Sequence, residues 1–231
     1  MAYYVTRENL REKISEWKRI IQPYNTHQMK LEPKNSALLV IDMQKFFLNP
    51  ESLTFTEGGL AIVENIRDLI RAYRSHSLPV IYTCHVHKSA QMDGGMMSWW
   101  WKGICLEGTE ESKIFEEIKP LPEEKIVFKH RYSAFYNTDL EIVLRCLGVK
   151  DLVITGIMTN MCCDSTARDA YYRDYRVFFL LDATGSVNED LHVATLKNTA
   201  FGFAYVTDTE EILAAVHKNK AEKVKKESVL R

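Results

Sequence analysis

The chain has 231 residues, and its 30 lysines and arginines nearly balance its 31 aspartates and glutamates, which gives a formal net charge of -1. This balance provides no basic surface for a nucleic acid, so we exclude that class of partner. A hydrophobic content of 46% is sufficient for a globular core, whereas no apolar run is long enough to cross a bilayer, so we expect no membrane contact.

The first 33 residues predict a helical arm. Leu10, Ile14, Trp17 and Ile21 recur at three- and four-residue steps among charged residues, which is the spacing of an amphipathic helix. Pro33 ends this segment before the first strand. We expect the arm to pack on its own domain or on a partner subunit, and we expect the protein to form a homo-oligomer.

An apolar strand over Ser36–Ile41 follows the arm and ends at Asp42. A carboxylate at the carboxyl end of a buried parallel strand lies where open α/β sheets bind ligands, although an aspartate at such a position also caps turns. The hydrophobic pattern then predicts a helix over residues 60–73 and a second strand over residues 78–83, which leads to His85 and His87.

Regular patterning fades between Lys88 and Pro122, where glycine and methionine pairs precede three consecutive tryptophans, Trp99–Trp101. A long loop inside a compact domain is usually a lid or a binding loop. Clustered tryptophans also form small satellite cores or contacts between subunits. The sequence leaves both interpretations open for this segment.

Strands and helices alternate through the second half of the chain. A third strand over residues 125–128 ends at Lys129, and a fourth over residues 152–155 leads into Cys162. The alternation predicts the α/β class, with a parallel sheet of six strands and helices on both faces. The other expected elements are helices over residues 138–146, 162–170, 189–200 and 209–217, strands over 176–181 and 203–206, and a basic tail over 218–231.

Five cysteines, an odd number with no paired spacing and no secretory signal, indicate reduced thiols in a cytoplasmic protein. Cys162 and Cys163 stand where the fourth strand joins the next helix. A thiol in the first turn of a helix lies among unpaired backbone N–H groups, which favour its thiolate and make it a nucleophile. Free cysteine is also among the most buried residue types, and adjacent residues of a helix point in different directions. At most one of the two can face a cleft.

Three strand ends bring Asp42, Lys129 and Cys162 to one edge of the predicted sheet. A thiol needs a base to take its proton and a cation to hold the thiolate, and an aspartate and a lysine supply both. The aspartate can later return the proton to a leaving amine. The three positions together predict an enzyme with a cysteine nucleophile.

The motifs around these residues resemble those of the isochorismatase-like cysteine hydrolases, which include nicotinamidase, N-carbamoylsarcosine amidase and ureidoacrylate amidohydrolase. The resemblance covers about residues 34–217 and rests on LLVIDMQKFF around Asp42, FKHRYSAFYNT around Lys129 and TGIMTNMCCDSTARDAYYRDY around Cys162. It implies a Rossmann-like three-layer α/β/α hydrolase domain with these three residues as the catalytic ones. Cys163 falls where the family usually carries a small apolar residue.

The same resemblance implies how the site is built and what it does. A cis peptide would join Ile157 to Met158, and the N–H groups of Met158 and Cys162 would form an oxyanion hole. Asp42 would deprotonate Cys162, the thiolate would attack the carbonyl of a small carboxamide or ureido compound, and water would hydrolyse the thioester without a cofactor. Contacts with this small-molecule substrate are implied for Phe47, His85, His87 and Tyr132.

The choice of substrate separates the branches of the family. The KHRYSAFYNT segment looks closer to the ureidoacrylate and carbamoyl amidases. A nicotinamidase-type, metal-assisted deamidase is the alternative, but the Asp-x-His metal motif of that branch reads His85-Val86-His87 here. We therefore expect no metal, with both histidines contacting the substrate instead. A non-catalytic binding homologue is a further alternative, although it would normally have lost one of the three catalytic residues.

Overall fold

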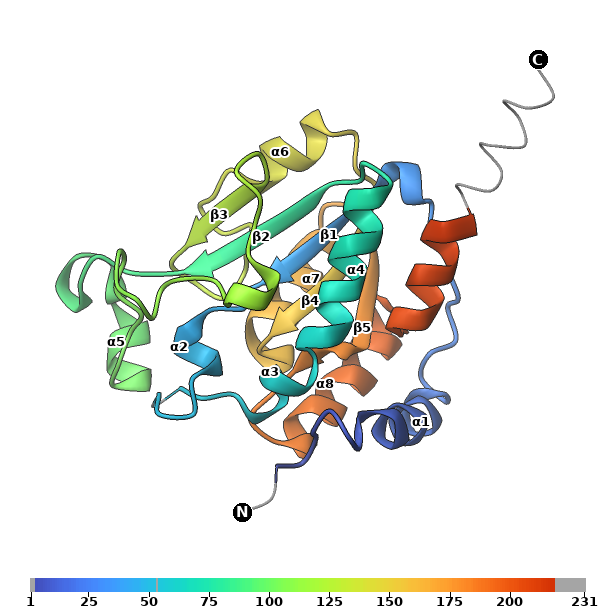
Figure 1. Ribbon diagram of the computed structural model, residues 1–231, viewed down its shortest axis with the longest axis horizontal. Coiled ribbons are helices and arrows are strands. Elements are labelled where there is room, and N and C mark those ends of the chain that lie inside the picture. The colour runs from blue at the N-terminus through green and yellow to red at the C-terminus, as the bar shows by residue number, and fades with distance from the viewer. Residues whose placement is uncertain (1–2, 53, 219–231) are drawn as a thin grey trace.

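The centre of the computed structural model, which describes residues 3–52 and 54–218, is a sheet of six strands (Figure 1). The strands are β1 (Ser36–Ile41), β2 (Val80–His85), β3 (Lys125–Lys129), β4 (Asp151–Ile157), β5 (Arg176–Gly185) and β6 (Tyr205–Thr207). Their order across the sheet is β3-β2-β1-β4-β5-β6, and every neighbouring pair is parallel. The sheet therefore grows in one direction from β1 to β3 and in the other from β4 to β6, with the reversal between β1 and β4.

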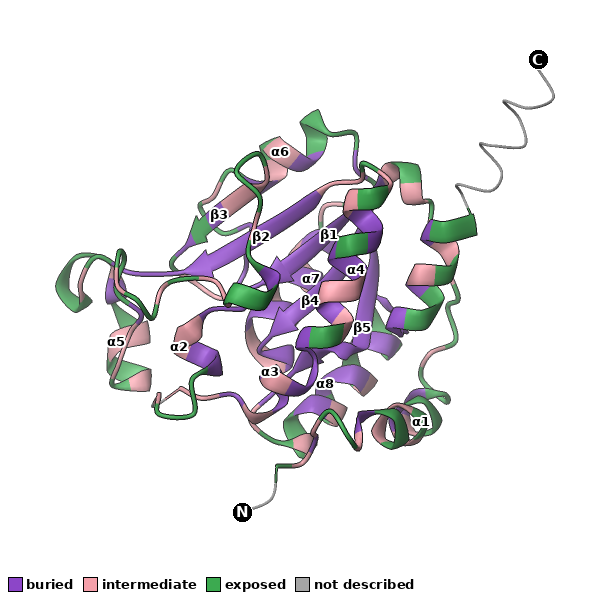
Figure 2. Cartoon of the chain, viewed as in Figure 1, coloured by how far each residue is buried: buried purple, intermediate pink, exposed green. Residues whose placement is uncertain are grey.

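Helices cover both faces of the sheet, which confirms the predicted three-layer arrangement (Figure 1). They are α1 (Leu10–Ile21), α2 (Lys45–Leu48), α3 (Glu57–Ala61), α4 (Val63–Ser75), α5 (Met96–Trp101), α6 (Leu140–Cys146), α7 (Asp164–Tyr171) and α8 (Glu189–Gly202), and residues 209–218 are also helical. One core packs α4 and residues 209–218 on the sheet, and the other packs α1, α6, α7 and α8. Figure 2 shows β1, β2, β4 and β5 buried between these layers, whereas β3 at the edge of the sheet is partly exposed.

Neighbouring residues of β1 explain why the strand is apolar without alternation. Leu38 belongs to the core under α4, and Leu39 belongs to the core on the opposite face. A strand that is covered on both faces needs an apolar side chain at every position.

In the part of the chain that the structure describes, no helix is both long and apolar enough to cross a membrane.

Most predicted elements are present, and most differences lie at their ends. The helix predicted over residues 60–73 is instead two helices, α3 and α4, with a break at Ile62. β2 continues two residues beyond the prediction, because His85 pairs in register with Lys129 of β3. β5 continues to Gly185 through the buried carboxylate of Asp182, which accepts hydrogen bonds from the backbone N–H and the hydroxyl of Thr209. Both strands therefore end in polar residues whose partners are distant in the sequence, so the hydrophobic pattern did not show where these strands end.

The turn after β4 differs from the predicted helix start. Residues Thr159–Cys163 form a single π-type turn, and α7 begins only at Asp164. Gly156 precedes this turn with a φ of 110°, and a Cβ there would lie 2.0 Å from the carbonyl oxygen of Ile41. Only glycine lets β4 approach β1 this closely. The glycine of the TG pair in the sequence motif is therefore required at this position of β4, just before the turn.

The N-terminal helix α1 packs on its own domain, one of the two arrangements that the sequence left open. Trp17 is buried against α8, where its indole N–H donates to Glu189 at 2.8 Å and its ring lies 4.4 Å from that of His192. The apolar stripe of α1 is therefore part of the core on this face of the sheet. The predicted basic tail falls, apart from Lys218, on residues 219–231, which lie outside the described residues.

Candidate active site

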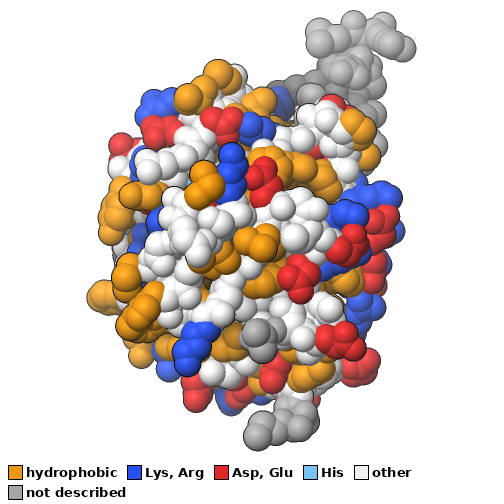
Figure 3. Space-filling model, turned by 90° about the vertical axis from the view of Figure 1, so that its left-hand side faces the viewer, with side chains coloured by type: hydrophobic (Ala, Val, Ile, Leu, Met, Phe, Trp, Pro, Cys, Tyr) orange, Lys and Arg blue, Asp and Glu red, His pale blue; other side chains and the backbone are white. Residues whose placement is uncertain are grey.

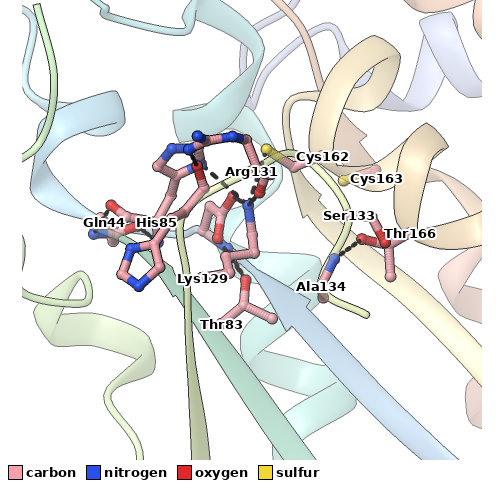
Figure 4. Close-up of polar contacts among 12 residues, drawn as sticks. Gln44, Thr83, His85, Lys129, Arg131, Ser133, Ala134, Cys162, Cys163 and Thr166 are labelled. Atoms are coloured by element: carbon pink, nitrogen blue, oxygen red, sulfur yellow. Dashed lines mark hydrogen bonds and ion pairs between the residues drawn. The ribbon is translucent and has the colours of Figure 1, made fainter. Parts of the chain in front are cut away.

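Four adjacent strands each deliver one side chain to the same edge of the sheet (Figure 4). Lys129 ends β3, His85 ends β2, Asp42 follows β1, and Cys162 lies in the turn after β4. This edge, where the order of the strands reverses, is where open α/β sheets bind ligands. The fold therefore brings together the three residues that the sequence predicted to be catalytic.

The amine of Lys129 is at the centre of this group. Its Nζ lies 2.7 Å from Oδ2 of Asp42 and 3.3 Å from Sγ of Cys162. It also donates to the carbonyl of Arg131 at 3.0 Å and lies 3.2 Å from Nδ1 of His85. Burial by itself lowers the pKa of Lys129, but the charge of Asp42 and the hydrogen bonds to Asp42 and Cys162 outweigh burial and raise it. The ammonium is therefore charged, and it contacts the Asp42 carboxylate and the Cys162 sulfur at the same time.

Asp42 is buried and held in one orientation. Its backbone has a φ of 49°, a left-handed conformation that aspartate tolerates better than most residues. The hydroxyl of Thr83 accepts from the N–H of Asp42 at 3.1 Å and donates to Oδ1 of the same residue. A carboxylate oxygen of Asp42 lies within 4.8 Å of the Cys162 sulfur. Thr83 was not predicted as a site residue, although it ends the predicted second strand and strand ends meet at this edge of the sheet.

The two adjacent cysteines face different environments (Figure 4). Cys162 is 5% exposed and lines a cavity, whereas Cys163 is fully buried with its sulfur 4.0 Å from the carbonyl of Thr155. Burial raises the pKa of the Cys162 thiol, and the charge of Lys129 offsets this only in part. We expected a helix start to favour the thiolate at this position, but the turn is buried and precedes α7, so burial disfavours the thiolate instead. Removal of the thiol proton therefore calls for a base.

The backbone after β4 has an N–H without an acceptor at a residue that lines the same cavity. The peptide between Ile157 and Met158 is cis, as the resemblance implied. Met158 lines the cavity next to Cys162. Within the described residues, the backbone N–H of Met158 donates to no other group. It is thus free to donate to a substrate oxygen, which an oxyanion hole requires.

The cavity beside Cys162 has a volume of about 50 Å³ and a mostly apolar wall. Phe47, His85 and Tyr132, which were expected to contact the substrate, line it. Residues 90–101, which we call the cover segment, contribute Met97 and Trp101. The other lining residues are Phe46, Thr54, Gly103, Ile104, Cys105, Met158, Met161 and Cys162.

His87 does not line the cavity, which corrects the expected direct contact with the substrate. It is fully buried behind His85, and the two Nε2 atoms lie 3.0 Å apart. Burial, followed by the charge of Lys129, lowers the pKa of His85, so this ring is neutral. Because Nδ1 of His85 accepts from the ammonium, its proton lies on Nε2 and is donated to His87. His85 therefore turns only carbon atoms toward a substrate.

Among the residues that the structure describes, two groups of side chains have atoms close enough to bind a metal ion. The first consists of Asp42, His85 and Cys162, but the ammonium of Lys129 contacts all three and already places a positive charge among them. A second cation at this position would be repelled.

The second group consists of His87, Asp93 and His130. Nδ1 of His87 is buried without a hydrogen-bond partner among the described residues and lies 3.6 Å from Asp93. Nδ1 of His130 is held by the carbonyl of Val86 at 2.6 Å. Since His87 accepts from His85 at Nε2, it carries its own proton on Nδ1, and a metal would have to displace that proton. Independence from metals remains a prediction.

Gln44 connects the site to its surroundings and was not predicted as a site residue. Its Oε1 accepts from the backbone N–H of His85 at 2.7 Å, and its Nε2 donates to the carbonyls of His85 and Ser112. The side chain thus joins the ends of β1 and β2 to the loop before β3. Gln44 could have been predicted as a site residue from its place two residues after Asp42, inside the LLVIDMQ motif.

Several known proteins are similar to most of this chain. A family model described as "Isochorismatase domain" matches residues 36–211. Nicotinamidase 3 of Arabidopsis thaliana is 42% identical, over 82% of this chain and 92% of the relative. Ureidoacrylate amidohydrolase RutB of Caulobacter segnis is 29% identical, over 83% of this chain and 90% of the relative. The solved structure of a cysteine hydrolase from Pseudomonas syringae pv. phaseolicola 1448A has a TM-score of 0.79 at 30% identity and covers 83% of this chain and 96% of its own.

Proposed function

Because the chain belongs to the isochorismatase family, we propose that it is a cysteine-dependent amidohydrolase that releases ammonia from small, uncharged carboxamides. The observation that carries this proposal is the contact of the Lys129 ammonium with both the Asp42 carboxylate and the Cys162 sulfur. This group lies beside an apolar cavity. A base, a nucleophile and a fixed positive charge are what cleavage of an amide by a thiol requires.

The reaction begins with the neutral thiol of Cys162. Asp42 takes the thiol proton, and the sulfur forms a bond to the carbonyl carbon of the amide. Lys129 offsets the negative charge that this transfer leaves on the sulfur. The carbonyl oxygen becomes an oxyanion and accepts hydrogen bonds from the N–H groups of Met158 and Cys162.

The tetrahedral intermediate then collapses. Asp42 gives its proton to the amide nitrogen, the C–N bond breaks, and ammonia leaves a thioester on Cys162. A water molecule that Asp42 deprotonates attacks the thioester carbonyl and releases the carboxylic acid. The proton returns from Asp42 to the sulfur, so the enzyme ends in its initial state.

The cavity favours uncharged substrates over ureido acids. Among the described residues, no arginine, lysine, aspartate or glutamate side chain lines its wall. A substrate carboxylate buried there would lose its hydration without gaining an ionic partner, which costs several kcal/mol. Aromatic rings of Phe46, Phe47 and Trp101 instead suit a flat apolar body. The relative named nicotinamidase therefore resembles this protein in substrate class more than the ureidoacrylate amidohydrolase does.

A screen with ammonia detection tests the proposal. The panel contains benzamide and nicotinamide as uncharged carboxamides, and N-carbamoylglycine and ureidoacrylate as acids. We expect kcat/KM for an uncharged amide to exceed that for either acid by at least about tenfold. The Cys162→Ala variant is the control and should release no ammonia. Release of ammonia from the acids alone, or from the Cys162→Ala variant, would contradict the proposal.

A further inference from the structure

The turn that carries Cys162 is held by side chains from later parts of the chain. It lies between β4 and α7, and two of its residues, Thr159 and Asn160, make side-chain hydrogen bonds outside these two elements. Asn160 accepts from the hydroxyl of Ser186 at 2.7 Å. Because Asn160 stands two residues before Cys162 in the same turn, the position of the nucleophile depends on these contacts.

The contact of Thr159 is made inside the core. His192 of α8 is fully buried, and its Nε2 lies 3.1 Å from the carbonyl of Leu181. A carbonyl can only accept, so Nε2 carries the ring proton, and Nδ1 accepts from the Thr159 hydroxyl at 2.9 Å. Burial lowers the pKa of His192 to about 4, so the ring is neutral at physiological pH. This contact holds one end of the turn.

The contact of Asn160 leads instead to the N-terminal arm. The backbone N–H of Ser186 donates to the hydroxyl of Tyr4 at 3.0 Å. Ser186 is fully buried, and among the described residues its N–H has no other acceptor. The missing side chain of Gly58 leaves the space for this contact, since a Cβ there would lie 2.2 Å from the Tyr4 hydroxyl oxygen. Tyr4 therefore fixes the backbone from which the Ser186 hydroxyl reaches the turn.

This chain of contacts is separate from the wall of the cavity. Of the described residues, Tyr4, Ser186 and Asn160 are not among those that line it. The cover segment is part of the wall, and Figure 3 looks at the end of the molecule where its helix α5 lies, with hydrophobic side chains at the surface. Tyr4 precedes α1 and lies outside residues 36–211, which the family model matches. A change at Tyr4 should therefore act through the turn and not through a contact with the substrate.

We propose that Tyr4 is a positioning residue for the nucleophile. Its hydroxyl holds the backbone of Ser186, and the hydroxyl of Ser186 holds Asn160 and with it the turn of the nucleophile. The inference rests on the proposed function and adds to it a residue of the N-terminal arm. Because the core contact of the turn remains when Tyr4 is changed, the effect on turnover should be moderate.

Steady-state kinetics with an uncharged carboxamide separates positioning from stability. Tyr4→Phe removes the acceptor of the Ser186 N–H, so we expect kcat to fall about three- to tenfold while KM changes less than about twofold. Ser186→Ala should give a similar loss, and the double variant should lose no more than the larger single loss, because both changes act along one path. Tyr3→Phe, at an exposed tyrosine beside Tyr4, should change neither constant. A wild-type kcat in Tyr4→Phe, or losses that multiply in the double variant, would overturn the inference.

Alkylation by iodoacetamide tests the same contact without a substrate. Burial shields the sulfur of Cys162 and raises the pKa of its thiol, so a turn that is held less firmly should react faster. We expect the rate constant at Cys162 to rise by about threefold or more in Tyr4→Phe, with no rise at the fully buried Cys163. A rate at Cys162 that does not rise, or that rises equally at Cys163, would overturn the inference. If no amide is hydrolysed, the proposed function fails, and these alkylation rates alone decide whether Tyr4 positions the turn.

Discussion

The carboxyl edge of the sheet and the cover segment face the same cavity but are held in different ways. At the edge, Asp42 and Lys129 are fully buried at the ends of β1 and β3. Strand β1 pairs with a neighbour on both sides, and β3 pairs with one on one side. The cover segment carries two largely exposed tryptophans and is tied to the loop after β3 by the side chains of Trp101 and Arg131. In the proposed function, the chemistry therefore lies on a buried edge of the sheet, and the choice of substrate lies on a more exposed segment.

The largest effect should come from a change at the edge. Cys162→Ala should lower kcat by at least about 10⁴-fold, because the nucleophile is lost. Cys163→Ala should keep most of the activity, since that sulfur lies in the core beside Thr155. Steady-state kinetics with thermal melts of both variants checks this. Equal losses in the two variants would show that the direction of the side chain at these positions does not matter.

The next effect concerns the charge at the edge. Lys129→Met removes the ammonium that lowers the pKa of the Cys162 thiol, so that pKa rises further and less thiolate forms at neutral pH. We expect a loss of at least about a hundredfold in kcat, with partial recovery as the pH is raised. Lys150→Met, at an exposed lysine, is the control. A pH–rate profile of wild-type shape for Lys129→Met would show that the lysine acts only in packing.

A change in the cover segment should act mainly on binding. Trp101→Ala removes part of the cavity wall and should raise KM by about tenfold while changing kcat less. Trp99→Ala removes an exposed side chain from the same helix and should change neither constant. If Trp101→Ala lowers kcat as strongly as Lys129→Met does, the division of roles between edge and cover segment is refuted.

A change far from both regions should affect stability alone. Trp17→Ala removes a buried ring between α1 and α8, which should lower the free energy of unfolding by about 3–5 kcal/mol. The folded variant should keep kcat within about twofold of the wild type. Denaturant titration, with sedimentation to record the subunit count, measures the effect. A changed subunit count at unchanged stability would show that the arm serves assembly instead.

The smallest expected effect is that of a chelator. Since the Lys129 ammonium already lies among Asp42, His85 and Cys162, dialysis against EDTA should leave the activity unchanged. Activity that is lost and then restored by zinc would mean that a metal, not Lys129, supplies the positive charge near the substrate.

The grouping of the candidate residues at one edge of the sheet could be predicted from the sequence, because each of them ends or follows a recognisable strand. Asp42, Lys129 and Cys162 end or follow short apolar runs, and parallel strands bring their carboxyl ends to one edge. The contacts that orient these residues could not be predicted. Gln44 and Thr83 act through partners that are distant in sequence, and their own neighbours in the chain do not indicate those partners.

The sequence also could not show which side chains are buried or in which direction they point. His85 and His87 are two residues apart, yet one lines the cavity and the other lies behind it. The six residues of α5 are too short for a periodic pattern, so nothing in the sequence distinguished Trp101 from its two neighbours. Its inward direction depends on Tyr132, which stands 31 positions away.

Trapping of the thioester tests the central role of Cys162 most directly. Trypsin should release residues 151–168 as one peptide that contains both adjacent cysteines, so fragmentation between them assigns the modified one. After quenching during turnover of a slow carboxamide, we predict an acyl group on Cys162 that is absent from the Cys162→Ala variant. An acyl group on Cys163, or ammonia release without any acylated cysteine, would contradict the account.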